Sequence, residues 1–163
     1  MIDYGLSDRR SRSITLRAVD EENWRQVADI APRDEQREFA PALAARYLLL
    51  STLESNWNSL AVYAEEHVVG HVMWGVDDDD SHWIGGVLID AAHQGTGIGS
   101  AAMHLLIRWL AERPECDVIR LSYHPNNTVA ARLYEHLGFG PNGDFDGDEI
   151  VVERRLTEEL PGR

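Results

Sequence analysis

The sequence has no lysine, so all fifteen of its basic residues are arginines, against 28 acidic residues. The formal net charge is −13. A protein that binds nucleic acid needs basic surface to neutralise phosphates, and this class of function is therefore disfavoured. A small cationic substrate would be attracted by such a negative field. Alternatively, the acidity and the lack of lysine reflect genome composition or a salty cytoplasm.

Cysteine and long apolar runs are scarce as well. The single cysteine, Cys116, cannot form an internal disulfide, which favours a cytoplasmic protein. No apolar run approaches the roughly 18 residues that a membrane helix needs, and we expect no signal peptide. The seven histidines show no metal-ligand spacing, so we expect no bound metal.

The order of the predicted elements indicates an α/β fold. Residues 1–13 have no hydrophobic periodicity and are expected to form a loose leader, followed by one domain over residues 14–163. The strands are expected at 14–19, 60–65, 68–76, 83–90, 117–123 and 149–156, and the helices at 21–30, from Pro41, at 100–110 and at 125–138. This order predicts a mixed, mostly antiparallel central sheet of six to seven strands with helices on both faces.

A glycine-rich turn lies between the strand that begins at Trp83 and the helix that follows. Three glycines fall within five residues of the segment Gln94-Gly95-Thr96-Gly97-Ile98-Gly99-Ser100. Backbone N–H groups converge at a helix N-terminus, where the helix dipole is positive, and the glycines leave these groups uncovered. The turn therefore predicts a site for a phosphate group.

Two adjacent glycines, Gly85 and Gly86, interrupt the strand before this turn. Glycine weakens a strand, and within one it marks a bulge or the close approach of another backbone or a ligand. We therefore expect a bulge at this point of the central strand, which would splay the strand from its neighbour.

Two motifs in the right order then point to a family. The segment Gln94–Gly99 fits the pattern Q/R-x-x-G-x-G/A, and Asn127–Phe139 fits N-x-x-A-x-x-L-Y-E-x-x-G-F. With these motifs the chain resembles the GCN5-related N-acetyltransferase (GNAT) superfamily over residues 14–156. The resemblance implies the fold of that superfamily, acetyl-coenzyme A as cosubstrate, N-acetyltransferase activity and a homodimer.

Short segments spread along the chain also resemble bacterial spermine/spermidine acetyltransferases. These segments are Ile14–Arg17, Glu22–Trp24, Asp34–Gln36, Phe39–Pro41, Arg113–Cys116 and Leu121–Tyr123. The resemblance implies a small polyamine as the acceptor of the acetyl group. Three alternatives remain: an aminoglycoside-like antibiotic, a protein N-terminus, or a sensor that binds acetyl-coenzyme A without turnover.

The resemblance also implies how coenzyme A binds. Its pyrophosphate would lie on the N–H groups of residues 94–100, and its pantetheine arm would pair like a strand with residues 87–89. An N–H group near Leu88 or Ile89 would polarise the thioester carbonyl. The implied cofactor-binding residues are Val87, Leu88, Ile89, Gln94, Gly95, Thr96, Gly97, Ile98, Gly99, Ser100, Asn127, Ala130 and Tyr134.

The resemblance implies a role for Tyr134, which falls on the motif position that supplies the acid for the departing thiolate in relatives. Alternatively, it is a core tyrosine on the apolar face of its helix, and Asn127 either contacts the cofactor or merely begins that helix. No activated Cys or Ser nucleophile is evident, since Cys116 lies outside both motifs. We therefore expect direct attack of the amine in a ternary complex.

The base and the acceptor pocket are less well defined. An alkylammonium has a pKa near ~10, so a base must remove a proton before the nitrogen can attack. Some polyamine acetyltransferases carry a glutamate on the central strand, where this chain has Ile84-Gly85-Gly86. The bacterial relatives carry a larger, often basic residue near the position of Gly86. We expect Glu35 as the base, with Asp34, His71, His82 and Asp90 as alternatives; any of them could instead be a solvated surface residue. The expected acceptor-binding residues are Asp34, Glu35, Gln36, Phe39, Gly85 and Gly86.

Overall fold

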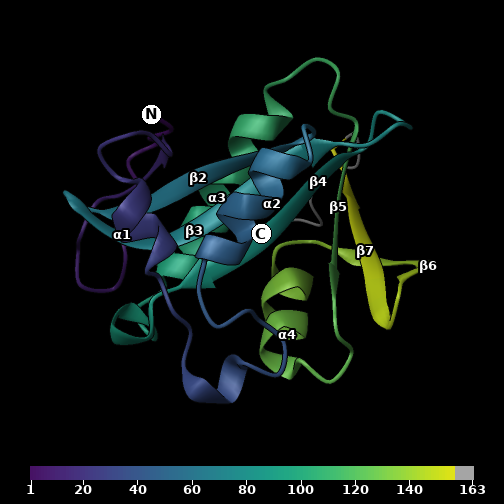
Figure 1. The fold of residues 1–163 in the computed structure, drawn as a ribbon. Coiled ribbons are helices and arrows are strands. Elements are labelled where there is room, and N and C mark those ends of the chain that lie inside the picture. The colour runs from purple at the N-terminus through teal and green to yellow at the C-terminus, as the bar shows by residue number, and fades with distance from the viewer. Residues whose placement is uncertain (157–163) are drawn as a thin grey trace.

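A mixed seven-stranded sheet in the order β1-β2-β3-β4-β5-β7-β6 dominates the computed structural model, which describes residues 1–156 (Figure 1). Its strands are β1 (Ile14–Ala18), β2 (Trp57–Ala64), β3 (His67–Val76), β4 (His82–Ile89), β5 (Val118–Tyr123), β6 (Gly140–Asp146) and β7 (Glu149–Arg155). The helices are α1 (Trp24–Ala28), α2 (Ala45–Leu53), α3 (Ile98–Ala111) and α4 (Thr128–His136), with short 3-10 turns η1 (Asp34–Gln36) and η2 (Ala91–His93). Strands β4 and β5 run parallel, and the other neighbouring strands run antiparallel.

Helices cover both faces of this sheet (Figure 1). Because successive side chains of a strand point to opposite faces, Val62 of β2 joins the core that α3 fills, whereas Ala61 and Tyr63 pack against Val27 of α1. Helix α3 supplies eight buried residues to the larger core. No helix of residues 1–156 is long and apolar enough to cross a bilayer.

The bulge expected in the central strand is confirmed. His71 of β3 pairs with Leu88, and Met73 pairs with Gly85, so one residue of β3 lies opposite two residues of β4. Gly86 is one of those two residues, and its φ of +58° is in the left-handed region that favours glycine. The bulge therefore begins at the second residue of the glycine pair.

Strands β4 and β5 separate beyond the first residues of β4. In the described chain they pair at His82–Ile119 and at Trp83–Arg120, and no pairing continues toward Ile89. The gap between them is the splay that the glycine pair predicts. It leaves one edge of β4, from Ile84 onward, without a strand partner.

Several boundaries differ from the expected ones. The helix expected at 21–30 is reduced to α1, because Asp20 accepts hydrogen bonds from the N–H groups of Glu22 and Asn23 in a preceding turn. The helix expected from Pro41 begins only at Ala45. The Gly- and Asp-rich segment before β7, expected as a loop, forms β6, which is joined to β7 by a tight turn.

The prediction of a loose leader over residues 1–13 is wrong. Ile2 forms a β-bridge with Leu16 of β1, and Ser7 forms one with Ser13. Asp8 is buried, and the N–H of Arg9 donates to the carbonyl of Thr96 at 2.8 Å. These residues thus pack on the domain as an N-terminal arm. The predicted domain covers residues 14–163, and its last seven residues lie outside the described residues.

Candidate active site

The glycine-rich turn between β4 and α3 presents bare backbone at the start of a 14-residue helix. Gly95 and Gly97 have φ values of +82° and +87°, a conformation that side chains with a Cβ rarely adopt. Within residues 1–156, the N–H groups of residues 95–100 donate to no protein acceptor. Free donors at the positive end of a helix dipole suit a phosphate, so the turn fits the expected cofactor.

The side chains of the turn are used to hold it rather than to reach a ligand. The amide of Gln94 donates to the carbonyl of Ile89 at 2.8 Å and to Oε1 of Gln36 at 2.7 Å. Thr96 and Ile98 are buried beneath the turn. Gln94, Thr96 and Ile98, all expected to bind the cofactor, therefore offer it backbone groups.

The residues expected to pair with pantetheine lie on the open edge of β4. Leu88 points its side chain away from that edge, into a small core with Ile30 and Ala44. Val87 and Ile89 pack against the larger core on the other face. The backbone of β4 can therefore pair with an extended ligand across the gap, as a further strand would.

Tyr134 lies on α4, and its ring packs against an aromatic ring of β5 and against another that follows α4. Its ring is 5.6 Å from the ring of Tyr123 and 6.3 Å from that of Phe139. Burial, above all, raises the pKa of Tyr134 well above its ordinary value, and Tyr47 and Glu149 add to the rise. The phenol is therefore protonated at neutral pH and can donate a hydrogen bond.

Asn127 begins α4 by accepting a hydrogen bond from the N–H of Ala130 at 3.2 Å. This is the helix-starting role that the sequence left open for it. Ala130 lies in the first turn of the same helix and is half-buried. Together the two residues fix where α4, and with it Tyr134, enters the site.

His71 is fully buried directly behind the bulge. Its Nδ1 lies 2.7 Å from the carbonyl oxygen of Gly86, and its Nε2 lies 2.9 Å from Oγ of Ser59. Because a carbonyl only accepts, Nδ1 carries the proton and Nε2 accepts from the serine. Burial lowers the pKa of His71 to about 4, partly offset by the bond to Gly86. Both ring nitrogens are thus engaged in holding the strand.

The linker with the expected base lies at the cofactor end of the gap. Asp34 and Glu35 are exposed in η1, whereas Gln36 is bonded to Gln94. Further along, the ring of Phe39 is 5.4 Å from that of His124, which follows β5. The linker therefore spans from the end of β4 to the end of β5.

The other two alternatives for the base have different surroundings. Asp90 accepts a hydrogen bond from the N–H of Ala31 at 3.2 Å and so ties the end of β4 to the segment after α1. His82 is buried where β4 and β5 still pair, and its ring nitrogens have no partner among the described residues. Neither side chain is connected to Tyr134 by a contact in the structure.

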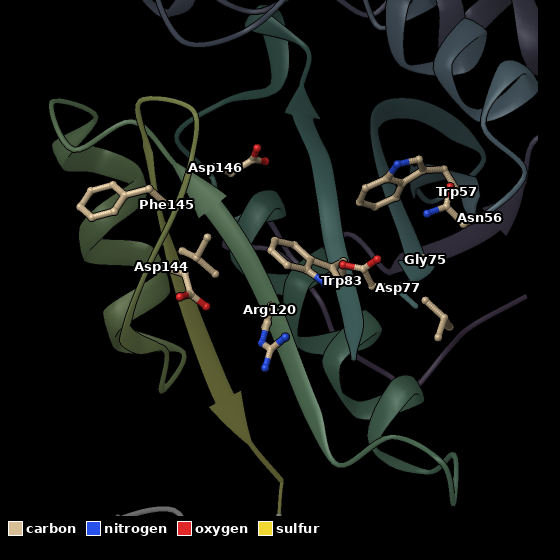
Figure 2. A pocket seen from close by; sticks show the side chains of 11 residues that line it. Asn56, Trp57, Gly75, Asp77, Trp83, Arg120, Asp144, Phe145 and Asp146 are labelled. Atoms are coloured by element: carbon tan, nitrogen blue, oxygen red, sulfur yellow. The ribbon is translucent and has the colours of Figure 1, made fainter. Parts of the chain in front are cut away.

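A pocket of about 510 Å³ lies beside Trp57 and Trp83 (Figure 2). Its wall includes three aromatic and three acidic side chains: Trp57, Trp83, Phe145, Asp77, Asp144 and Asp146. A Cβ added to Gly85 would lie 3.3 Å from the ring of Trp57, so the pocket adjoins the strand at the glycine pair. Arg120 also lines it, but its charge is countered by Asp79 at 2.7 Å and Glu153 at 3.5 Å.

The sequence predicted neither this pocket nor Glu149 at the start of β7. Glu149 accepts a hydrogen bond from the hydroxyl of Ser122 at 3.2 Å. Burial is the main cause of the raised pKa of both Tyr47 and Tyr134. The negative charge of Glu149 raises these two pKa values further. The charge of this carboxylate thus acts on both tyrosines. The aspartates of the pocket look like turn residues in the sequence, and no local pattern groups them with the aromatic residues that complete the wall.

Comparisons with known proteins agree with this geometry. The family model described as the acetyltransferase (GNAT) family matches residues 16–139. A spermine/spermidine N(1)-acetyltransferase of Bacillus subtilis is 31% identical over 151 residues, which span 86% of this chain and 98% of that protein. The chain therefore belongs to the acetyltransferase (GNAT) family. It is an N-acetyltransferase whose cosubstrate is acetyl-coenzyme A.

Solved structures share the fold. RimJ of Mycobacterium smegmatis in complex with CoA-disulfide has a TM-score of 0.74 and 21% identity, over 96% of this chain and 88% of that one. The aminoglycoside acetyltransferase AAC(6')-Ib in complex with coenzyme A and kanamycin has a TM-score of 0.73 and 20% identity, over 88% and 95%. The predicted fold class is thereby confirmed, including the splayed central strand.

Proposed function

We propose that this protein transfers an acetyl group from acetyl-coenzyme A to a primary amine of a small polyamine of the spermine/spermidine type. The observation that carries the proposal is the pocket beside Gly85, whose wall combines three aromatic rings with three aspartates. Aromatic faces attract alkylammonium groups, and carboxylates attract them over a longer range. A chain with several ammonium groups can occupy such a pocket while one amine extends toward the open edge of β4.

Two further facts support a polycationic acceptor. The net charge of −13 favours the approach of cations to the protein as a whole. The Bacillus subtilis relative, 31% identical over most of this chain, is named for spermine and spermidine. The expected cytoplasmic homodimer remains a prediction.

The reaction forms a C–N bond and breaks a C–S bond, and the proton that leaves the amine balances the thiolate. Acetyl-coenzyme A supplies the thioester carbonyl. An ammonium with a pKa near ~10 must first lose a proton. The proposed acceptors of that proton are Glu35, expected from the sequence, and Glu149, whose negative charge contributes to the raised pKa of Tyr134. Direct attack in a ternary complex remains part of this proposal.

Tyr134 is proposed to act on the sulfur. A phenol of raised pKa is a weaker acid than an ordinary thiol, whose pKa is near ~8.5, so full proton transfer from Tyr134 alone is uphill. A hydrogen bond from the phenol still stabilises the negative charge that develops on the departing sulfur. The residues expected to bind the acceptor, namely Asp34, Glu35, Gln36, Phe39, Gly85 and Gly86, are proposed to line the path between the linker and the pocket.

The test follows thiol release with acetyl-coenzyme A and a panel of amines: spermine, spermidine, putrescine, a monoamine, an aminoglycoside and a peptide with a free N-terminus. We expect release with the polyamines and little with the monoamine. Release confined to the aminoglycoside or the peptide would replace the polyamine by that acceptor. Binding of acetyl-coenzyme A without release for any amine would indicate a sensor.

Variants connect the substrate to the pocket. The double variant Asp144→Asn/Asp146→Asn removes two carboxylates from the pocket wall, and we expect the KM for spermine to rise roughly tenfold with little change in kcat. The matched control is Asp148→Asn, because Asp148 lies at the tip of the same hairpin and does not line the pocket. Equal effects of the two variants would contradict the assignment of the pocket.

A further inference from the structure

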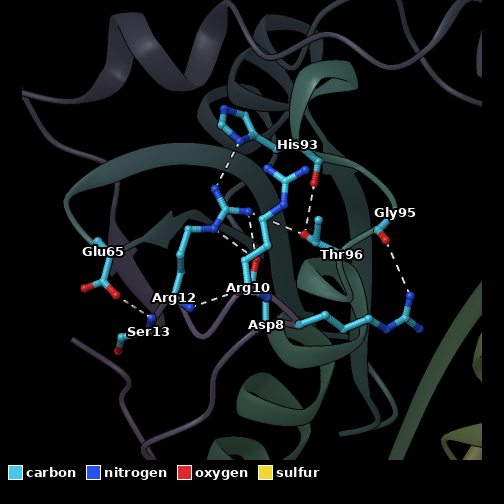
Figure 3. A network of polar contacts seen from close by, with 9 residues as sticks. Asp8, Arg10, Arg12, Ser13, Glu65, His93, Gly95 and Thr96 are labelled. Carbon is cyan, nitrogen blue, oxygen red and sulfur yellow. Dashed lines mark hydrogen bonds and ion pairs between the residues drawn. The ribbon is translucent and has the colours of Figure 1, made fainter.

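We propose that Arg9 binds a phosphate group of coenzyme A, and that Asp8 and Arg12 position it over the glycine-rich turn. The N-terminal arm would then be part of the cofactor site, although it lies far from both family motifs in the sequence. The inference rests on acetyl-coenzyme A as cosubstrate and is independent of the acceptor proposed above. Figure 3 shows the network of contacts around the arm.

Asp8 and Arg12 form a buried clasp that shapes the arm. The guanidinium of Arg12 donates to Oδ2 of Asp8 at 2.7 Å and 3.0 Å, and Oδ1 accepts from the backbone N–H groups of Arg10 and Arg12. The side chain of Asp8 is fully shielded from solvent. Burial alone raises the pKa of Asp8, but the bonds from Arg12 outweigh it and hold the pKa to about 2. The clasp is therefore charged and closed at neutral pH.

The clasp also anchors the arm to the turn. The guanidinium of Arg12 lies 3.4 Å from Oγ1 of Thr96 and 3.4 Å from Nδ1 of His93. Arg9 lies between the two partners of the clasp in the sequence and faces the turn. Its backbone N–H donates to the carbonyl of Thr96 at 2.8 Å. The backbone of Arg9 is thus fixed relative to the glycines.

The side chain of Arg9 continues along the turn. Its guanidinium donates to the carbonyl of Gly95 at 3.4 Å, and a Cβ on Gly97 would lie 3.8 Å from Cγ and 3.9 Å from Nε of Arg9. On the other side, a Cβ on Gly95 would lie 3.9 Å from the guanidinium of Arg33. Two arginines therefore flank the bare backbone that fits a phosphate.

The charges at this place favour an anion. In a chain of net charge −13, neither Arg9 nor Arg33 forms an ion pair with a carboxylate of residues 1–156. A positive side chain beside the N-terminus of a helix is unfavourable, because both carry positive charge. A phosphate between them removes this conflict and pairs with the fork of a guanidinium. The arm thus brings Arg9 to the position where a phosphate of the cofactor is expected.

Calorimetric binding of three ligands tests the inference without any turnover. Coenzyme A carries all phosphates, dephospho-coenzyme A lacks the 3′-phosphate, and pantetheine lacks every phosphate. We expect Arg9→Gln to weaken coenzyme A about tenfold or more and to leave pantetheine unchanged. If Arg9 contacts the 3′-phosphate, dephospho-coenzyme A binds the variant as it binds the wild type. If it contacts the diphosphate, both phosphorylated ligands are weakened equally.

Two more variants make the result specific. Arg25→Gln removes the same charge from exposed α1, where the guanidinium lies over the ring of the neighbouring Trp24, and should leave all three affinities unchanged. Asp8→Asn keeps Arg9 but weakens the clasp, and should reduce the affinity for coenzyme A less than Arg9→Gln does. Thermal unfolding checks that each variant is folded. Wild-type affinity of the folded Arg9→Gln protein for coenzyme A would overturn the inference, whereas failure of the polyamine assay alone would not.

Discussion

The imidazole of His71 donates a hydrogen bond from Nδ1 to the carbonyl oxygen of Gly86, over 2.7 Å. This bond joins a fully buried side chain of β3 to the bulged residue of β4. The ring is also stacked on Tyr47 of α2, with the two centroids 5.3 Å apart and the planes 4° from parallel. The bulge is therefore held by packing and hydrogen bonding from neighbouring elements, and the open edge of β4 has a defined position before the cofactor binds.

The first prediction concerns the dependence of stability on pH. The pKa of His71 is about 4 in the folded protein and near 6.5 when the chain is unfolded. Between these values the unfolded chain binds more protons, so the stability that the neutral ring provides is complete above pH 6.5 and is lost as the pH falls to about 4. The full loss is roughly 3 kcal/mol in the free energy of unfolding. Urea denaturation from pH 7 to pH 4 measures it.

Two substitutions serve as comparison for this measurement. His71→Gln removes the titrating ring, and we expect it to be less stable at pH 7 and to lose less stability on acidification than the wild type. His67→Gln alters an exposed histidine at the start of β3 and should leave the pH profile unchanged. If the wild type and His71→Gln lose stability in parallel, the titration of His71 does not contribute.

The second prediction concerns Gly86 itself. Its φ of +58° and the 3.0 Å between an added Cβ and Cε1 of His71 both oppose a side chain. We expect Gly86→Ala to reduce the free energy of unfolding by about 1–3 kcal/mol. The control is Gly99→Ala, whose Cβ would meet Ile89 at an ordinary 3.6 Å in the first turn of α3, and it should be neutral or slightly stabilising. Chemical denaturation compares the two, and a neutral Gly86→Ala would show that the bulge tolerates another conformation.

Local sequence signals were sufficient for most of the fold. The glycine pair in β4 predicted the bulge because few other local causes place two glycines inside a strand. The Gly97 turn and the apolar positions of α3 predicted a helix that begins next to a phosphate site, because both signals are encoded by adjacent residues. Polar segments were predicted less well. The arm, with Asp8 at its clasp, and the strand β6 gain their order from partners distant in sequence, and no local pattern records those partners.

The same distinction explains what was missed in the site. The expected cofactor side is built from contiguous motifs, so residues 94–100 and Tyr134 could be proposed from the sequence alone. The proposed acceptor pocket combines β2, the turn after β3, β4 and the β6–β7 hairpin, and its aspartates look like solvated turn residues when taken one segment at a time. Glu149 lies beside Ser122 only because β7 inserts between β5 and β6.

The third prediction decides between the two carboxylates proposed as base. Glu149→Gln removes a negative charge that acts on Tyr134, and we expect kcat/KM for spermine to fall about a hundredfold at pH 7, in the range typical of a lost general base. Glu35→Gln, on the exposed turn η1, should change it less than about threefold. The pH dependence of kcat/KM gives a second measurement, since loss of the base should bring the activity of Glu149→Gln closer to the wild type at high pH. The reverse order of effects would assign the base to Glu35.

The last prediction concerns Tyr134. If its phenol stabilises the departing sulfur, Tyr134→Phe keeps the ring contacts with Tyr123 and Phe139 and loses only the hydrogen bond. We expect kcat to fall by about a hundredfold or more, while the affinity for coenzyme A and the free energy of unfolding stay close to the wild type. Tyr123→Phe, which removes a hydroxyl from the ring next to it, is the matched control and should retain most of the activity. Steady-state kinetics combined with calorimetric binding separates the two effects, and an equal loss of turnover and of cofactor affinity would make Tyr134 a packing residue.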